Sequence, residues 1–316
     1  MISKIGGFAR FAMSPVKFLK KYDAFRKLYP FGSKFSEVDP DGNRLHYIEV
    51  GNGETILFLH GFPAWSFMYR RLILELASDF HCIALDNLGY GFSDKPLRYK
   101  YTIQNHIKNA IKFAENMHFK KFHIVMHDFG VGIGLAMAER WPERISSMVF
   151  LNSSCFKHPK LPFTIVLMKI PVISTILTRC TNLLQAMFLH IGMNFLSKET
   201  KEGYLKPYDS VLNRVAISGG LSDIPLFPDN PSLAAYDDIE AKAFILCNKK
   251  MKFFWGDLDF FHNFASLKRW AKILPNALLK RYEQGGYFLL EDLPEARHDI
   301  RVFLLKCRDI NKSMFK

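Results

Sequence analysis

Val125-Met126-His127-Asp128-Phe129-Gly130 is the stretch that decides the fold of this chain. It joins an apolar run at 122–126 (FHIVM) to a stretch with helical patterning at 130–140. A sharp turn from a strand into a helix exposes one side chain at the top of a sheet, and a small residue such as Gly130 relieves the crowding in that turn. The exposed residue here is Asp128, whose carboxylate suits attack on an sp³ carbon to give an alkyl ester. A helix N-terminus favours the anionic form of Asp128, and its alternative role is that of a helix N-cap.

A second turn, His60-Gly61-Phe62-Pro63, follows the apolar run at 55–59 (TILFL). In proteins built around such a nucleophile turn, the loop after an earlier strand supplies a backbone N–H toward the developing oxyanion. We therefore expect His60, Phe62 and Phe129 to form an oxyanion or leaving-group site. The backbone N–H groups of the two phenylalanines are the candidate donors.

Short apolar runs alternate with amphipathic stretches along most of the chain, which is typical of an α/β protein with a mostly parallel sheet and helices on both faces. The predicted strands are 44–50, 55–59, 81–85, 122–126, 145–151, 251–255 and 277–282, and the predicted helices are 66–78, 102–117, 130–140, 263–273 and 294–308. The alternation stops at about residue 155 and resumes at about residue 248. We interpret residues 155–247 as a helical cap inserted into a core formed by residues 29–154 and 248–316.

Residues 1–28 are predicted to form a basic amphipathic arm. The chain has 316 residues and a net charge of +13, and residues 1–35 carry eight Lys or Arg against one Asp. Such an arm packs on the domain with a solvated basic face, lies on an anionic membrane surface as a peripheral contact, or serves as a targeting presequence. The rest of the chain is only mildly basic and has no nucleic-acid-binding motif, so we predict no nucleic-acid partner.

The five cysteines are scattered and form no CxxC pair, which argues against a disulfide scaffold and against a zinc site. They favour a reducing compartment and hence a cytoplasmic protein, with membrane-surface association through the arm as the alternative. The chain contains no P-loop and no dinucleotide-binding glycine motif after its first strand, so we predict no cofactor and no metal. Nothing in the sequence indicates an oligomeric state.

Further motifs accompany the two turns in a fixed order along the chain. They are Trp65-Ser-Phe-Met-Tyr-Arg-Arg71, Asp86-Asn-Leu-Gly-Tyr-Gly-Phe-Ser-Asp-Lys-Pro96, Tyr204-Leu-Lys-Pro-Tyr-Asp209, Trp255-Gly256 with Asp259, and Leu290-Glu291-Asp292. From about residue 29 to about residue 306, the chain resembles the haloalkane dehalogenase and epoxide hydrolase branch of the α/β-hydrolases. Within that branch it looks most similar to the dehalogenase-like β-lactone decarboxylases of long-chain olefin biosynthesis.

The resemblance implies that Asp128 is a nucleophile and that Asp259, in the loop after 251–255, is the acid of a relay. The chain departs from the family at the base. The family's catalytic His stands in a G-H-Y-x-L-E-D context, and Tyr287 occupies its position in Gly286-Tyr287-Phe-Leu-Leu-Glu-Asp292. A phenol with a pKa of ~10 is a poor general base at pH 7. Phe129 and Phe62 stand where dehalogenases usually carry a Trp and often an Asn, which argues against efficient dehalogenation.

The resemblance also implies a substrate pocket that includes Trp65 and the cap residues Tyr204 and Tyr208, although packing is the alternative role of both tyrosines. His262 follows Asp259 by three residues and lies in the right loop to replace the missing base. A lone His is nevertheless more often structural than catalytic, so we place Tyr287 rather than His262 in the catalytic set with Asp128 and Asp259.

These observations favour an enzyme that acts on an apolar small molecule, such as a long-chain β-lactone, through an alkyl ester on Asp128. Reduced or altered activity is expected without a His base. Loss of CO₂ from the ester would regenerate Asp128 without a water step, and Tyr287 could then donate a hydrogen bond to a carboxylate or alkoxide. The alternative is a catalytically impaired pseudo-enzyme that binds an apolar ligand or a partner protein. A third hypothesis is a membrane-surface protein whose basic arm is the functional part.

Overall fold

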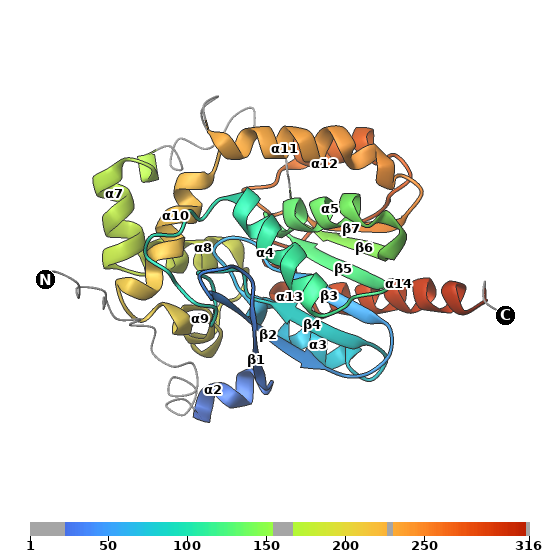
Figure 1. The fold of residues 1–316 in the computed structure, drawn as a ribbon, viewed down its shortest axis with the longest axis horizontal. Coiled ribbons are helices and arrows are strands. Elements are labelled where there is room, and N and C mark those ends of the chain that lie inside the picture. Colours follow the sequence, from blue (N-terminus) through green and yellow to red (C-terminus); the bar gives the residue numbers. More distant parts are fainter. Residues whose placement is uncertain (1–22, 154–166, 226–229, 314–316) are drawn as a thin grey trace, which may run out of the picture.

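One sheet of eight strands organises the computed structural model, which describes residues 23–153, 167–225 and 230–313 (Figure 1). The strands are β1 (Ser33–Glu37), β2 (Arg44–Val50), β3 (Thr55–Leu59), β4 (His81–Leu85), β5 (Phe122–His127), β6 (Ile145–Leu151), β7 (Lys250–Gly256) and β8 (Leu278–Tyr282). Their spatial order is β1-β2-β4-β3-β5-β6-β7-β8. Strand β2 runs antiparallel to both of its neighbours, and every other pair is parallel. The α/β fold predicted from the sequence is confirmed.

Helices cover both faces of this sheet. They are α2 (Asp23–Leu28), α3 (Arg70–Leu76), α4 (Ile103–Asn116), α5 (Gly130–Arg140), α7 (Pro171–Thr175), α8 (Leu183–Gly192), α9 (Lys198–Leu205), α10 (Val215–Asp223), α11 (Pro231–Lys242), α12 (Phe264–Ile273), α13 (Leu289–Asp292) and α14 (Pro294–Ser313). Among the described residues, no single helix has the length and apolar character of a membrane span. The segments Val172–Cys180 and Leu183–Gly192 meet that test only as a pair, and they are bent by 80° relative to each other.

Burial on both faces explains why the central strands read as continuous apolar runs. In β3, Ile56 and Phe58 belong to a core cluster that includes residues of α3 and α14. Their neighbours Leu57 and Leu59 belong to a second cluster that includes residues of α4, α5, α11 and α12. Since successive side chains of a strand point to opposite faces, the sheet separates two hydrophobic cores.

The predicted strands all occur, with ends shifted by no more than one residue, and one further strand, β1, was missed. The β1 sequence is short and mostly polar, and its residues are only partly buried or exposed. Its identity as a strand comes from pairing with β2 rather than from its own pattern. The helix predicted at 66–78 is a 3₁₀ turn at Ser66–Tyr69 followed by α3.

Helices α7 to α10, which lie within the segment predicted to form a cap, form a layer beside the sheet (Figure 1). Helix α11, which was predicted as part of the cap, contributes Tyr236 and Ile239 to the core cluster of α4 and α5. The predicted cap boundaries at residues 155 and 247 stay a prediction, and α11 shares its apolar contacts with the helices on one face of the sheet.

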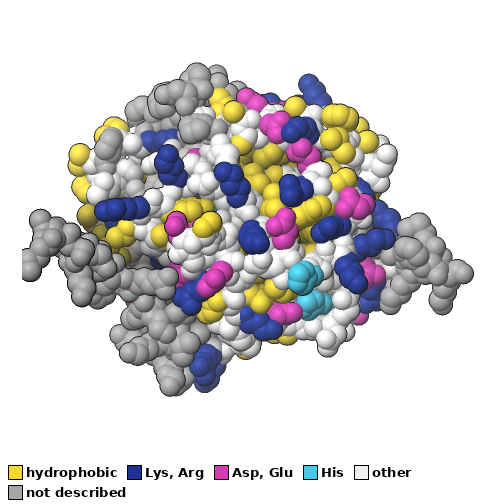
Figure 2. All heavy atoms as spheres, viewed as in Figure 1, with side chains coloured by type: hydrophobic (Ala, Val, Ile, Leu, Met, Phe, Trp, Pro, Cys, Tyr) yellow, Lys and Arg dark blue, Asp and Glu magenta, His cyan; other side chains and the backbone are white. Residues whose placement is uncertain are grey.

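Of the predicted N-terminal arm, only the residues from Asp23 onward are described. Phe25 of α2 is buried, with its ring centroid 6.1 Å from that of Trp65 and 5.8 Å from that of Phe67. Residues 1–22 lie outside the described residues, as do residues 154–166 of the predicted cap. A membrane contact through the arm stays a prediction. On the face shown in Figure 2, Lys and Arg side chains are interspersed with acidic and apolar ones rather than gathered into one stripe.

Candidate active site

A strained turn at Asp128 joins β5 to α5. Asp128 has a φ of 49°, a left-handed conformation that is unfavourable for a residue with a Cβ and that persists only where the surroundings enforce it. A Cβ at Gly130 would lie 2.4 Å from the carbonyl oxygen of Leu59, and one at Gly61 would lie 2.3 Å from the Asp128 Cβ. Glycine is required at both positions because the two turns predicted from the sequence approach each other this closely.

The Asp128 carboxylate is held by backbone N–H groups. Its Oδ2 accepts a hydrogen bond from the Phe62 N–H at 2.8 Å, and the Phe129 N–H also bonds to it. The two predicted oxyanion donors therefore meet at the carboxylate itself. Burial opposes ionisation of Asp128, but the hydrogen bond and charge of His262 outweigh it and lower the pKa of Asp128 to about 2. The carboxylate is an anion at physiological pH.

His262 lies between two carboxylates. Its Nε2 is 3.2 Å from Oδ1 of Asp128, and its Nδ1 is 3.0 Å from Oδ2 of Asp259. Burial disfavours the charged ring, but the two carboxylates outweigh burial and raise the pKa of His262 to about 10. The geometry thus brings together Asp128 and Asp259, as predicted, and adds a histidine that was set aside as structural.

Asp259 also fixes the direction of the His262 ring. Its Oδ1 accepts the backbone N–H groups of Phe261 and His262, at 2.7 and 3.0 Å, and so closes a tight turn. Its Oδ2 accepts a further hydrogen bond from Nδ2 of Asn152 at 2.9 Å. A carboxylate in such a turn, followed three residues later by His, is the sequence signal that could have identified His262.

Tyr287 is buried beside His262, and its hydroxyl interacts with the Asp128 carboxylate as a hydrogen-bond donor rather than as a base. Its hydroxyl donates a hydrogen bond to the carbonyl oxygen of Phe62. Its ring is stacked on that of His262, at an interplanar angle of 13° and a centroid separation of 5.8 Å. Burial, together with the charge of Asp128, raises the pKa of the Tyr287 phenol well above its usual value.

His127, which precedes Asp128, lies within hydrogen-bonding distance of the Tyr287 carbonyl oxygen, with its Nε2 at 2.9 Å. Burial lowers the pKa of His127 to about 4.

The segment that carries Tyr287 is hydrogen-bonded to the end of α8 and to the residues just after it. The N–H of Phe288 donates to the carbonyl oxygen of Gly192, at the end of α8, over 3.0 Å. Close by, the N–H of Asn194 donates to Oδ1 of Asp292 over 2.9 Å.

Asp128, His262 and Tyr287 all line one cleft. The cleft contains about 900 Å³ of empty space, counting the part open to solvent. Most of its other lining residues are aromatic or aliphatic: Phe62, Tyr90, Tyr101, Ile103, Phe129, Phe188, Ile224, Pro225, Tyr236 and Phe261. An apolar enclosure with few polar groups is typical of sites for small apolar ligands. Among the described residues, no group of three or more His, Cys, Asp or Glu is arranged to hold a metal ion.

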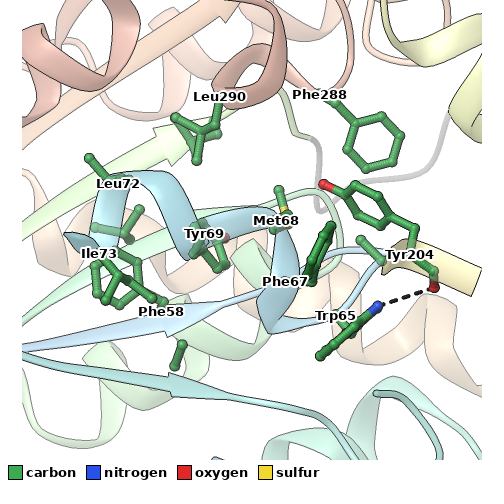
Figure 3. Close-up of a cluster of buried hydrophobic side chains, with 14 of the residues drawn as sticks. Phe58, Trp65, Phe67, Met68, Tyr69, Leu72, Ile73, Tyr204, Phe288 and Leu290 are labelled. Carbon is green, nitrogen blue, oxygen red and sulfur yellow. Dashed lines mark hydrogen bonds between the residues drawn. The ribbon is translucent and has the colours of Figure 1, made fainter. Parts of the chain in front are cut away.

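Three predicted pocket residues do not line this cleft, and their assignment to it is corrected. Trp65 is fully buried, and its Nε1 donates to the carbonyl oxygen of Tyr204 over 3.1 Å (Figure 3). The hydroxyl of Tyr204 donates to Glu291 at 2.9 Å, and that of Tyr208 accepts from the N–H of Gly91 at 3.2 Å. These bulky side chains connect α9 and the turn that follows it to the sheet domain, where their polar groups have buried partners.

His60 also lies outside the cleft lining and supports its loop instead. Its Nδ1 is 3.0 Å from the carbonyl oxygen of Gly61, and its Nε2 accepts the N–H of Asn87 at 3.0 Å. Burial lowers the pKa of His60, so the ring is neutral where it accepts this hydrogen bond. Its predicted place in a leaving-group site is therefore corrected to a structural one.

Comparison with known proteins agrees with this architecture. Residues 54–294 match the family described as alpha/beta hydrolase fold. The chain is 33% identical over 273 residues to a cis-3-alkyl-4-alkyloxetan-2-one decarboxylase from Shewanella oneidensis, covering 84% of this chain and 85% of that protein. It is 28% identical over 276 residues to haloalkane dehalogenase 2 of Mycobacterium tuberculosis, covering 85% and 93%. The solved structure of haloalkane dehalogenase DbeA from Bradyrhizobium elkani superposes with a TM-score of 0.79 at 21% identity, covering 89% of this chain and 99% of that one.

Proposed function

The chain belongs to the alpha/beta hydrolase fold family, and from that premise we propose that it is an enzyme in which Asp128 attacks an apolar alkyl substrate and forms an alkyl ester. The observation that carries the proposal is the placement of Asp128. Its ionised carboxylate stands on a strained turn, is held by the Phe62 N–H, and faces an apolar cleft. A carboxylate oriented in this way is suited to displacement at carbon, since little reorganisation remains to be done.

The substrate class we propose is a β-lactone with long alkyl groups. The relative from Shewanella oneidensis is named for a four-membered lactone that carries two alkyl groups. The aromatic and aliphatic lining of the cleft suits alkyl chains. Phe62 and Phe129 offer no side-chain N–H to a departing halide, whereas the carboxylate released from a lactone ring stays attached to the substrate and needs no separate halide site.

The ester formed from a lactone has two fates. Asp128 attacks the sp³ ring carbon that is bonded to the ring oxygen. The bond between that carbon and the ring oxygen breaks, and the former lactone carbonyl becomes a carboxylate on the substrate. In one fate the bond to this carboxylate breaks, its electron pair forms a carbon–carbon double bond, and CO₂ and Asp128 are released. That route transfers no proton. In the other fate water cleaves the ester, and a base is needed to activate the water.

A pseudo-enzyme that binds an apolar ligand is the second candidate. The observation that favours it is Tyr287, which is held by a hydrogen bond to Phe62 at the position where the family carries its catalytic histidine. If no group activated water, an ester that could not lose CO₂ would persist.

Intact-mass measurement tests both candidates. The protein is incubated with a long-chain alkyl β-lactone, products are followed in parallel, and Asp128→Asn is the control. Alkene and CO₂ from the unaltered protein but not from Asp128→Asn are the expected result. A lasting adduct on Asp128 without turnover would show that Asp128 attacks and that release of the ester is blocked. Neither adduct nor product from folded protein would overturn the proposed function and favour the second candidate.

A further inference from the structure

We propose that His262, delivered by the loop after β7, is the group that activates water against the Asp128 ester, and that Tyr287 is a positioning residue that backs its ring. This inference rests on the proposed alkyl ester at Asp128. It places the base on a different loop from the one that carries it in the resembled family, where the equivalent position is Tyr287.

The first argument is geometric. His262 faces the cleft, and its Nε2 is within 3.2 Å of the Asp128 carboxylate that would carry the ester. Its Nδ1 points to Asp259, which is buried and further fixed by Asn152. A base within reach of the reacting group, oriented by a second carboxylate, has the arrangement expected of a nucleophile–base relay. The other histidine beside Asp128, His127, bonds instead to the Tyr287 carbonyl.

The second argument concerns charge. In the free protein two anions face His262 and keep it protonated, so it cannot accept a proton. Esterification neutralises Asp128 and removes one of these anions. The imidazolium then loses part of its stabilisation, and its proton becomes easier to release. His262 would therefore become a base after the ester forms.

The third argument is the role left to Tyr287. Its ring covers the face of His262, and its hydroxyl holds the Phe62 carbonyl. The N–H of the same Phe62 residue holds Asp128. Tyr287 therefore limits the tilt of the His262 ring and fixes the residue that orients the nucleophile, and its hydroxyl also has a hydrogen-bonding interaction with the Asp128 carboxylate itself.

The proposed step balances without any further reactant. Nε2 of neutral His262 takes a proton from water as the water oxygen bonds to the carbonyl carbon of the Asp128 ester. The tetrahedral intermediate collapses, its bond to the alkyl oxygen breaks, and His262 returns the proton to the departing alkoxide. The second water proton, left on the new Asp128 carboxyl, passes to Nε2 of His262 and restores the imidazolium of the free protein. The products are an alcohol and an Asp128 carboxylate that contains one oxygen from water.

A primary alkyl iodide is the probe that isolates this step, because its ester has no carboxylate to lose and can leave only by hydrolysis. Hexyl iodide is incubated with each protein in water labelled with heavy oxygen. The intact mass reports the ester, and the mass of the peptide that contains Asp128 reports oxygen exchange. The variants are His262→Asn, Tyr287→Phe and the exchange variant His262→Tyr/Tyr287→His. His298→Asn is the matched control, because His298 is exposed on α14.

The expected results differ between the variants. The unaltered protein and His298→Asn release the alcohol and gain heavy oxygen on Asp128. His262→Asn forms the ester but releases it at least about 100-fold more slowly, with no heavy oxygen gained. Tyr287→Phe forms the ester several-fold more slowly but still releases it, and the exchange variant recovers release relative to His262→Asn.

Normal ester release by His262→Asn, or an ester trapped by Tyr287→Phe alone, would overturn this inference and leave the proposed function standing. An exchange variant that folds, as judged by circular dichroism, but releases no faster than His262→Asn would overturn the role assigned to Tyr287. Absence of an Asp128 ester in every protein, with the iodide and with the β-lactone, would instead overturn the proposed function.

Discussion

Replacing Asp128 by asparagine is the most direct test of the electrostatics at His262. The two carboxylates raise the pKa of His262 from its usual 6.5 to about 10 against the effect of burial. At about 1.4 kcal/mol for each pKa unit, this corresponds to roughly 5 kcal/mol in favour of the charged ring. The carboxylates of Asp259 and Asp128 lie 3.0 and 3.2 Å from the ring nitrogens, so each supplies about half of the attraction. Asp128→Asn should therefore lower the pKa of His262 by at least about 2, to about 8 or below.

The assay is a pH titration of histidine ring signals by NMR, with the His262 signal assigned through its loss in His262→Asn. Asp257→Asn is the matched control, because Asp257 follows β7 directly and pairs with Arg281 at the surface. It should leave the pKa of His262 unchanged. A pKa of His262 near 6.5 in the unaltered protein, or one that Asp128→Asn does not lower, would refute the reasoning. The asparagine variant also has the charge state of the esterified enzyme, so its His262 pKa predicts the pH at which ester hydrolysis reaches half its maximum.

Four further outcomes follow from features of the fold. Since the pKa of His262 is raised on folding, its ion pairs stabilise the protein fully below about pH 6.5, and this contribution is lost as the pH rises through about 10. The difference in unfolding free energy between the protein and His262→Asn, from urea titrations, should shrink over that range, and a constant difference would contradict the ion-pair assignment. Asp128→Gly should be about 1 kcal/mol more stable than Asp128→Ala, because a φ of 49° strains any residue with a Cβ; the opposite order would count against strain at this turn. Glu291→Gln should cost about 3 kcal/mol in urea unfolding, since it leaves the buried guanidinium of Arg70 without its carboxylate; a loss below about 1 kcal/mol would show that this pair is not needed. Gly256→Ala should lower the thermal midpoint sharply, at a cost of about 3 kcal/mol, because the new methyl group would lie 2.4 Å from a backbone oxygen; an unchanged midpoint would show that the adjoining loop yields freely.

The sheet could be predicted because its strands carry their own signals. Runs such as TILFL in β3 are buried on both faces, so their apolar character is continuous and easily read. The turn at Asp128 could be predicted for a related reason: the glycines at 61 and 130 are required by close approach of chain to chain. Strand β1 lacks such a signal, since its partly exposed residues take their structure from the partner strand.

The site was only partly predictable, because its decisive contact joins strands that are not neighbours. Strand β6 separates β5 from β7 in the sheet. Whether the loop after β7 turns His262 toward Asp128 depends on the hydrogen bonds with which Asp259 closes its turn, and the sequence does not specify that these form. The prediction that Trp65 and Tyr204 line the pocket was wrong for a different reason. A motif shows that an aromatic residue is required, but not whether it binds substrate or packs in the core. Here Trp65 donates a hydrogen bond to the Tyr204 carbonyl within the core.

The hydrogen bond from Phe288 to Gly192 connects the loop that carries Tyr287 directly to the end of α8. A movement of α8 away from the sheet would therefore displace this loop. Through the hydrogen bond of the Tyr287 hydroxyl, it would also displace Phe62. Binding of a ligand in the cleft and ordering of the Tyr287 loop would then favour each other. A ligand that holds α8 in place should slow hydrogen exchange at the Phe288 amide, although Phe288 does not line the cleft. Under the proposed function, a bound substrate that contacts α8 would thus also help to order the loop of Tyr287 and, through it, the residue that holds Asp128.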